Sequence, residues 1–250
     1  MKTTYTKYLT DSAVRWNLVS RNVCELVSPP RIVKTEMQPL TMEQAHKLLE
    51  SVRGHRLEML LTLALTTGMR RGEMLALRWA NVDFERRTVK VHRTVDYIPK
   101  YGYVETEPKT AAGRRTILLP AFVVEMLKEH RTRQLEARLK AGDAWERRDL
   151  VFTGLSGGYF NPRYMDKLFS KVLVEAGLEH IRFHNLRHSA ATLLLSMGVD
   201  MKVIQEILGH SSYLMTANLY SHVLPKMQQG AMGKWDDEFR PDDQGDKEAE

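Results

Sequence analysis

The segment covering residues 184–220 constrains the fold most, because its helix-forming runs are separated by glycines. A first run with helical apolar spacing ends before Gly198, which suits a left-handed C-terminal cap. A second run, residues 201–208, repeats apolar side chains at helical spacing until Gly209. A third short helix is expected to end near Tyr220. The sequence therefore predicts a compact set of three short helices.

Capping residues predict where other helices begin. Thr41 and Gln44 have the three-residue spacing of a capping box, and Asp200 can cap the helix that follows it. Gly68 allows the chain to turn between two helices. The expected upstream helices cover residues 42–52, 56–66, 70–79, 122–139 and 162–176.

Period-two alternation of apolar and polar residues predicts three strands. Valines alternate with polar residues in the segment 88–95, and segments 103–107 and 115–119 have the same character. Residues 109–113 are expected to form the turn of the last hairpin. The expected fold class is mainly α with a small three-stranded antiparallel β-sheet (α+β).

Four polar residues within the segment 184–220 form a set suited to phosphoryl transfer. His184 and Arg187 are three residues apart, so both side chains leave the same helix face. His210 falls at a helix end, and Tyr220 follows one short helix later. A phosphodiester under attack spreads negative charge over its oxygens, so it needs fixed cations, a nucleophile and an acid. A second arginine, Arg70, follows the apolar helix upstream.

With both segments in view, the chain resembles the tyrosine recombinase, or phage integrase, family over about residues 36–225. The family motifs TG-x-R-x-x-E, H-x-L-R-H, LGH and a tyrosine followed by a histidine occur in order, which is more specific than any single motif. Their residues are Thr67, Gly68, Arg70, Glu73, His184, Leu186, Arg187, His188, Leu208, Gly209, His210, Tyr220 and His222. A catalytic lysine is expected in a hairpin between the first two motifs, and Lys109 occupies that place.

The resemblance implies a site-specific DNA strand transferase with the tyrosine recombinase catalytic-domain fold. Tyr220 is then the nucleophile, which forms a 3′-phosphotyrosyl bond and frees a 5′-hydroxyl. Arg70 and Arg187 are expected to neutralise the phosphate oxygens. Lys109 is expected to protonate the leaving 5′ oxygen.

The histidines and one glutamate take the remaining roles that the resemblance implies. His184 is the expected proton acceptor from Tyr220, and His210 is expected to donate a hydrogen bond to the phosphate. Two residues are expected to support them. Glu73 lies three residues after Arg70 and would hold its side chain, while His188 would be a structural hydrogen-bonding partner.

The spacing of His180, His184 and His188 also permits a shared metal-binding face. No HExxH glutamate and no cysteine cluster accompanies them. We therefore expect no metal ion. No nucleotide or other cofactor is expected either, because the phosphotyrosine bond retains the energy of the cleaved bond.

The resemblance divides the chain into three parts. Residues 1–35 are expected to be a remnant of the N-terminal core-binding domain with its linker, since relatives usually have a whole DNA-clamping domain there. Residues 36–225 are the expected catalytic domain. Residues 226–250 are a C-terminal segment with an acidic tail that is expected to be disordered.

The charge distribution is consistent with a nucleic-acid partner. The 250 residues carry a net charge of +6, but residues 236–250 contribute −6, so the preceding residues carry +12. A generally soluble basic surface explains the charge alone equally well. The longest apolar stretch, residues 57–65, is about half the length of a membrane span. Cys24 stands alone, so a reducing cytoplasm, in association with the nucleoid, is the expected location.

The expected function is site-specific recombination, for the integration or excision of a phage or mobile element. The expected partners are double-stranded DNA attachment sites, further copies of the chain in a tetramer on DNA, and an accessory directionality factor. No membrane partner is expected. Two alternatives stay open: type IB topoisomerase-like relaxation by the same residues, and a truncated DNA-binding remnant without full recombination activity.

Overall fold

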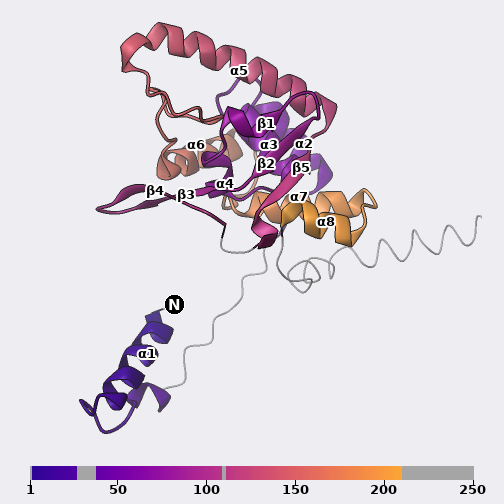
Figure 1. Cartoon of the computed structure of the whole chain (residues 1–250). Coiled ribbons are helices and arrows are strands. Elements are labelled where there is room, and N and C mark those ends of the chain that lie inside the picture. The colour runs from indigo at the N-terminus through magenta and orange to yellow at the C-terminus, as the bar shows by residue number, and fades with distance from the viewer. Residues whose placement is uncertain (1, 27–37, 109–110, 210–250) are drawn as a thin grey trace, which may run out of the picture. The chain divides into compact units, whose positions relative to one another are not determined.

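The computed structural model describes residues 2–26, 38–108 and 111–209 (Figure 1). By its internal contacts the chain divides into two compact units, Met1–Gln38 and Pro39–Glu250.

The first unit consists of helix α1 (Lys2–Arg15) and the single-turn helix η1 (Val23–Glu25). Asn22 caps η1, since its side-chain oxygen accepts a hydrogen bond from the Cys24 backbone N at 2.9 Å. In the part of the chain that the structure describes, no helix is long and apolar enough to cross a membrane.

The second unit is mainly helical, with a small antiparallel sheet and a separate hairpin, which confirms the predicted fold class. Its helices are α2 (Met42–Ser51), α3 (Glu58–Thr67), α4 (Arg71–Leu75), α5 (Ala121–Ala141), α6 (Pro162–Glu175), α7 (Asn185–Ser196) and α8 (Met201–Leu208). Its strands are β1 (Val82–Asp83), β2 (Thr88–Val91), β3 (Thr94–Ile98), β4 (Gly102–Thr106) and β5 (Arg115–Leu118).

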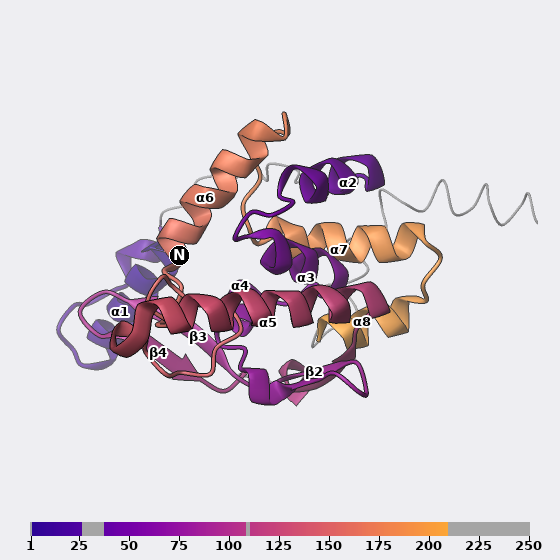
Figure 2. The same cartoon turned by 90° about the horizontal axis from the view of Figure 1, so that it is seen from above.

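Helix α3 forms the centre of the core. It is apolar on nearly all sides, and eight of its ten residues are buried, as expected for a helix surrounded by others. Helices α2, α5 and α7 pack against it (Figure 2). Burial of each leucine stabilises the fold by roughly 1.5–3 kcal/mol. The C-terminal end of α3 is therefore a firmly held starting point for the turn that carries Arg70.

The predicted start and stop signals have the predicted effects. Thr41 Oγ1 accepts from Gln44 N at 3.2 Å, and Gln44 Oε1 accepts from Thr41 N at 3.0 Å, which completes the capping box. Asp200 caps α8 by accepting from Lys202 N at 2.7 Å. Gly68 ends α3 with φ +59°, a left-handed conformation that glycine adopts without steric strain.

The three-stranded sheet has the order β1-β2-β5, with antiparallel pairing throughout. Val89 of β2 lies opposite Val82 on one side and Ile117 on the other. The prediction for its third strand was wrong. Segment 103–107 lies instead in the separate β3–β4 hairpin, and the two-residue strand β1 completes the sheet.

Segment 88–95 was predicted as one strand, but it is divided into β2 and β3. Helix α4 provides the physical reason, because it packs closely against β3. A Cβ on Gly72 would lie only 2.8 Å from the backbone oxygen of Val95. Contact with α4 therefore takes β3 out of the sheet.

Helix α4 also ends earlier than predicted, at Leu75 rather than near residue 79. The chain that follows pairs with a later segment: Trp79 N donates to Asp149 O at 2.9 Å, and Val151 N donates to Leu77 O at 2.8 Å. These hydrogen bonds replace those that a longer helix would make.

Candidate active site

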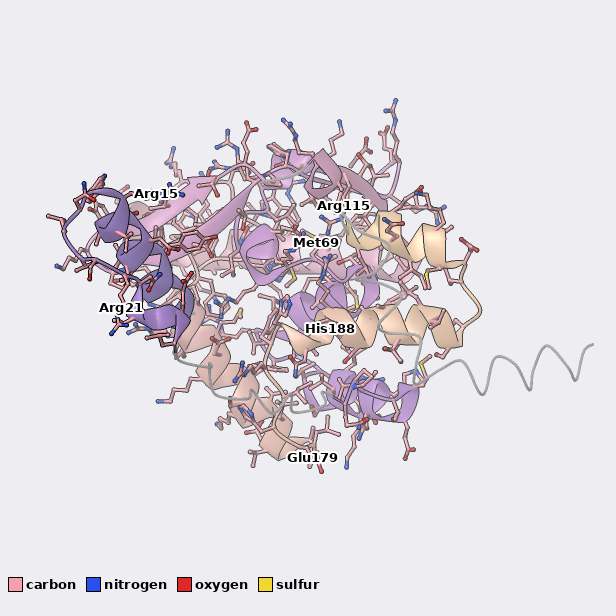
Figure 3. The ribbon with its side chains drawn as sticks, turned by 90° about the horizontal axis from the view of Figure 1, so that it is seen from below. Arg15, Arg21, Met69, Arg115, Glu179 and His188 are labelled. Atoms are coloured by element: carbon pink, nitrogen blue, oxygen red, sulfur yellow. The ribbon has the colours of Figure 1, made fainter. Side chains whose placement is uncertain are left out.

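Four segments that are distant in sequence meet beside the C-terminal end of α3. They are the turn after α3, the start of β5, the first turn of α7 and the end of α8. Gly68 permits this packing, because a Cβ there would collide with Leu208 Cδ2 and lie 3.5 Å from Ala190 Cβ. Figure 3 labels Met69, Arg115 and His188, which belong to three of these segments. The described residues of the predicted motifs therefore come together in space.

Arg70 and Glu73 make the contact that their spacing predicts. Arg70 Nη1 donates to Glu73 Oε1 at 2.7 Å, and the Arg70 backbone N donates to Glu73 Oε2 at 2.9 Å. Arg70 Nη2 also donates to the backbone oxygen of Gly209 at 3.4 Å. The Arg70 side chain is 39% exposed, whereas that of Glu73 is 3% exposed. Arg70 thus presents its guanidinium at the surface from a buried carboxylate anchor.

Glu73 has a second cationic partner, Arg115, which the sequence reasoning missed. Arg115 Nη2 donates to Glu73 Oε2 at 3.0 Å, and Nη1 donates to Glu73 Oε1 at 3.2 Å. The signal that could have found Arg115 is its place in β5: it shares a strand face with the buried Ile117, and a basic residue on a buried face requires a partner.

The two arginines keep the Glu73 carboxylate ionised. Burial alone would raise its pKa, but hydrogen bonding and the positive charge of Arg115, with hydrogen bonds from Arg70, more than offset burial and lower the pKa. Each carboxylate oxygen is therefore already engaged. Glu73 orients cations and is not available as a proton acceptor at neutral pH.

Arg187 is buried, with 4% of its surface exposed. Its Nη1 donates to the Gly68 backbone oxygen at 2.8 Å, but its buried Nη2 has no hydrogen-bond partner among the described residues. Burial, together with the positive charge of Arg70, lowers the pKa of Arg187 to about 9, against the opposing charge of Glu73. The guanidinium therefore stays charged at neutral pH and retains an unused donor.

His184 and His188 lie at the start of α7 with their rings edge to face, 5.5 Å between centroids. Burial, followed by the positive charges of Arg187, Arg70 and Arg71, lowers the pKa of His184. Burial, followed by His184 and Arg187, lowers the pKa of His188. Both imidazoles are therefore neutral at pH 7, in the form that accepts a proton.

Three of the predicted site residues, Lys109, His210 and Tyr220, lie outside the described residues. Described residues near two of them reach the cluster: Gly113, four residues after Lys109, accepts from Arg115 Nη1 at 3.3 Å, and Gly209, the residue before His210, accepts from Arg70. We use the name Glu73 cluster below for Arg70, Glu73, Arg115 and Arg187.

His180 does not share the neighbours of His184 and His188, although the three histidines are spaced four residues apart in the sequence. Its Nε2 lies 3.5 Å from Ser170 Oγ of α6. Over the described ranges, no group of three or more histidine, cysteine or acidic side chains is placed to hold a metal ion.

A hollow of about 620 Å³ opens beside the cluster, and its lining includes Arg70 and His184. Residues of α6 also line it, among them Asp166, which accepts from Arg71 Nη1 at 2.7 Å. Most of its charged lining is cationic. Its three arginines, Arg70, Arg71 and Arg182, outnumber its two aspartates, Asp96 and Asp166, so the hollow favours an anionic ligand.

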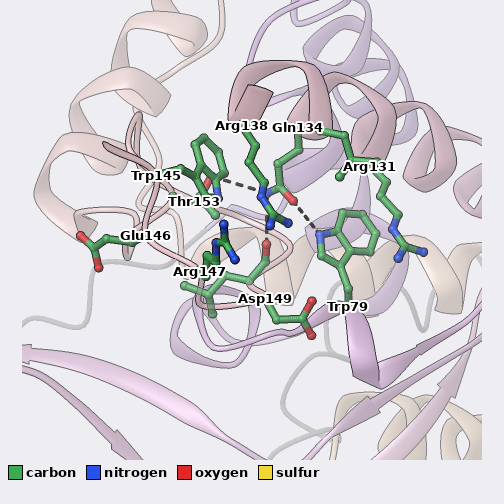
Figure 4. A pocket seen from close by; sticks show the side chains of 12 residues that line it. Trp79, Arg131, Gln134, Arg138, Trp145, Glu146, Arg147, Asp149 and Thr153 are labelled. Atoms are coloured by element: carbon green, nitrogen blue, oxygen red, sulfur yellow. Dashed lines mark hydrogen bonds between the residues drawn. The ribbon is translucent and has the colours of Figure 1, made fainter. Parts of the chain in front are cut away.

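A second, smaller hollow of about 210 Å³ lies under the C-terminal half of α5 (Figure 4). We call it the α5 hollow; its lining includes Trp79, Arg131, Gln134, Arg138, Arg147 and Asp149. Trp79 Nε1 donates to Gln134 Oε1 at 2.7 Å, and Gln134 Nε2 donates to Leu150 O at 3.1 Å. Trp79 and the half-buried Gln134 therefore have hydrogen-bond partners here, so the Glu73 cluster is the better candidate for chemistry.

The fold and the Glu73 cluster together define a mainly helical domain in which Arg70 lies close enough to the buried Arg187 for its charge to lower the pKa of Arg187. A model of the phage integrase family matches residues 38–227, which is most of the chain. The chain therefore belongs to the phage integrase family.

Two curated relatives illustrate the likeness. A "Tyrosine recombinase XerC-like" protein of Caldanaerobacter subterraneus subsp. tengcongensis is 37% identical over 223 residues, covering 85% of this chain and 57% of that protein. The ICEBs1 integrase of Bacillus subtilis is 28% identical, covering 91% of this chain and 62% of that protein. The chain thus spans roughly three fifths of the length of these relatives.

Solved structures show the same fold. A Tn1549 transposon integrase in complex with a circular intermediate DNA superposes with a TM-score of 0.72 at 20% identity, covering 91% of this chain and 77% of that one. The XerA recombinase superposes with a TM-score of 0.59 at 23% identity, covering 86% and 67%.

Proposed function

We propose that this chain cuts and rejoins DNA at specific sites through a 3′-phosphotyrosyl bond to Tyr220. The buried Arg187 is the observation that carries the proposal. Its Nη1 is fixed by Gly68, while its Nη2 has no partner among the described residues. A buried cation with an unused donor is costly unless an anion completes it. A scissile phosphate held between Arg187 and Arg70 would do so.

In the first step, the Tyr220 hydroxyl oxygen attacks phosphorus and its proton passes to His184. The lowered pKa of His184 suits this role, because the imidazole is neutral before the attack. The bond from phosphorus to the 5′ oxygen breaks, and Lys109 protonates that oxygen. A 5′-hydroxyl is released.

The two arginines stabilise the charge that develops on the phosphate oxygens, and His210 donates a hydrogen bond to them. In the second step, the 5′-hydroxyl of another strand attacks the phosphotyrosine and displaces Tyr220. The covalent bond retains the energy for rejoining, so no nucleotide is consumed.

The proposed partners are duplex attachment sites, three further copies of the chain in a tetramer on DNA, and an accessory directionality factor. Relatives support the DNA partner, since the Tn1549 integrase and the XerH recombinase have been solved with DNA substrates. Names such as "ICEBs1 integrase" support a role in moving a genetic element. We also propose the division into residues 1–35, 36–225 and 226–250.

The test uses a nicked suicide substrate, in which the cleaved end diffuses away and the covalent complex accumulates. The wild-type chain should give a slow band on a denaturing gel. Tyr220→Phe should give none, because it lacks the nucleophilic oxygen, while its binding of the same DNA should be nearly unchanged. A covalent band of normal intensity from Tyr220→Phe would remove Tyr220 from the role.

A further inference from the structure

Arg115 differs from Arg70 and Arg187 in the number of hydrogen bonds that its guanidinium donates within the protein. Its side chain is 7% exposed. Nε donates to the Ile207 backbone oxygen at 2.6 Å, Nη1 donates to Glu73 and to Gly113, and Nη2 donates to Glu73. All three guanidinium nitrogens therefore donate within the protein, through four of their five N–H groups.

The partners of Arg115 belong to three separate segments that carry proposed site residues. Gly113 ends the single-turn helix η3 (Ala111–Gly113), in the segment between β4 and β5 that also contains Lys109. Ile207 is in the last turn of α8, which leads into His210. Glu73 binds Arg70 through the same carboxylate oxygen, Oε1, to which Arg115 Nη1 donates.

The packing around Arg115 brings these segments into close contact. A Cβ on Gly209 would lie 2.5 Å from Ala112 O and 2.9 Å from Arg115 Cδ. The end of α8 therefore lies directly against η3 and against the Arg115 side chain. Movement of the guanidinium would release both segments and one side of the Glu73 carboxylate.

We propose that Arg115 is a positioning residue, which holds Arg70, the segment Ala111–Gly113 that follows Lys109, and the end of α8 that precedes His210 in one arrangement beside the scissile phosphate. This inference rests on the proposed strand-transfer function. Arginine is required because its planar fork serves the carboxylate and two backbone oxygens in different directions. A lysine has one terminal nitrogen and cannot reach all three segments.

The test compares Arg115→Lys with Arg114→Ala in single-turnover cleavage of the suicide substrate. Arg115→Lys keeps a positive charge beside Glu73 and should fold, which near-ultraviolet circular dichroism checks. We expect cleavage to slow by about 10²-fold, the scale of a misplaced reacting group, with little change in DNA binding. Arg114 is the matched control, since its ion pair with Glu107 lies at the surface, with side chains 59% and 74% exposed.

A substrate whose 5′-bridging oxygen is replaced by sulfur separates positioning from general loss of structure. The thiolate leaves without protonation, so this substrate should fully rescue Lys109→Ala and should not rescue Arg70→Ala. Arg115→Lys should be rescued in part, because only the Lys109 share of its defect is bypassed. A merely structural defect would slow both substrates equally.

Three results would overturn the inference. They are near-normal cleavage by folded Arg115→Lys, an equal defect on the oxygen and sulfur substrates, and complete rescue by sulfur, which would leave Arg115 with no role toward His210. Tyr220→Phe, run in parallel, tests the proposed function separately. If Tyr220→Phe forms no adduct while Arg115→Lys cleaves normally, only the role of Arg115 is wrong.

Discussion

The Glu73 cluster and the α5 hollow both contain several arginines of the second unit. They differ in whether their less exposed polar atoms have hydrogen-bond partners. In the α5 hollow, Gln134 is bonded on both sides, and Arg131 lies over the Trp79 ring at 5.4 Å. In the Glu73 cluster, the buried Arg187 retains a nitrogen with no partner in the described part of the chain. A hollow lined by cations is common to both regions. The candidate site is distinguished by a buried donor, Arg187 Nη2, that has no partner among the described residues.

The largest difference between the two regions should appear in cleavage. Arg187→Ala removes the buried cation and should raise the barrier to cleavage by roughly 3 kcal/mol or more, as for other lost donors to a transition-state oxyanion. Arg138→Ala in the α5 hollow should leave the rate unchanged. Single-turnover cleavage of the suicide substrate measures both. Near-normal cleavage by Arg187→Ala would contradict the proposal that two arginines bind one phosphate.

The two regions should also differ in how much folding stability is lost when a glutamate is replaced by glutamine. Glu73→Gln removes the charge from between two arginines and should destabilise the fold by roughly 3 kcal/mol, as for other broken buried ion pairs. The matched control is Glu146→Gln at the α5 hollow. Its pair with Arg148 has side chains 49% and 47% exposed, so we expect a loss of about 0–1 kcal/mol. Denaturant unfolding measures both, and equal losses would show that the Glu73 cluster is not a buried network.

The pH dependence of cleavage should reflect His184. Because its pKa is lowered, the neutral base persists below pH 6.5, and the rate should fall only as the pH drops through this lowered value. His184→Gln should be slow and should lose this acidic limb. His55 is a half-buried control histidine outside the Glu73 cluster, whose Nδ1 accepts from Leu57 N at 3.2 Å, and His55→Gln should keep the limb. An unchanged limb in His184→Gln would assign the base to another residue.

The smallest effect is expected from the polar contacts of the α5 hollow. Gln134→Ala removes hydrogen bonds to Trp79 and Leu150 and should cost about 1 kcal/mol of stability for each bond left unmade. Its cleavage rate should equal that of the wild type once folding is matched. A large loss of cleavage with unchanged stability would instead give the α5 hollow a part in the reaction.

Local signals predicted much of the helical framework. The capping box of Thr41 and Gln44, the Asp200 cap and the Gly68 turn depend on residues within three or four positions, so the sequence reports them directly. The third strand of the sheet was predicted wrongly, because contact between α4 and β3 is a tertiary effect that alternation does not reveal.

The site was predicted where its residues fall within one motif, as for Arg70 with Glu73. Arg115 was missed, because its partners Glu73 and Ile207 are 42 and 92 residues away in the sequence. Burial is what turns this arginine from an ordinary surface cation into part of the site. Sequence spacing carries no information about burial across such distances.

The most direct test of the central claim is to identify the residue that carries the DNA. The suicide substrate is cleaved by the wild-type chain, the covalent complex is digested with protease and nuclease, and the nucleotide-linked peptide is sequenced by mass spectrometry. The modified residue should be Tyr220, with the phosphate on the 3′ side of the cleavage point. A nucleotide on any other tyrosine, or a 5′-phosphate linkage, would contradict the proposed chemistry.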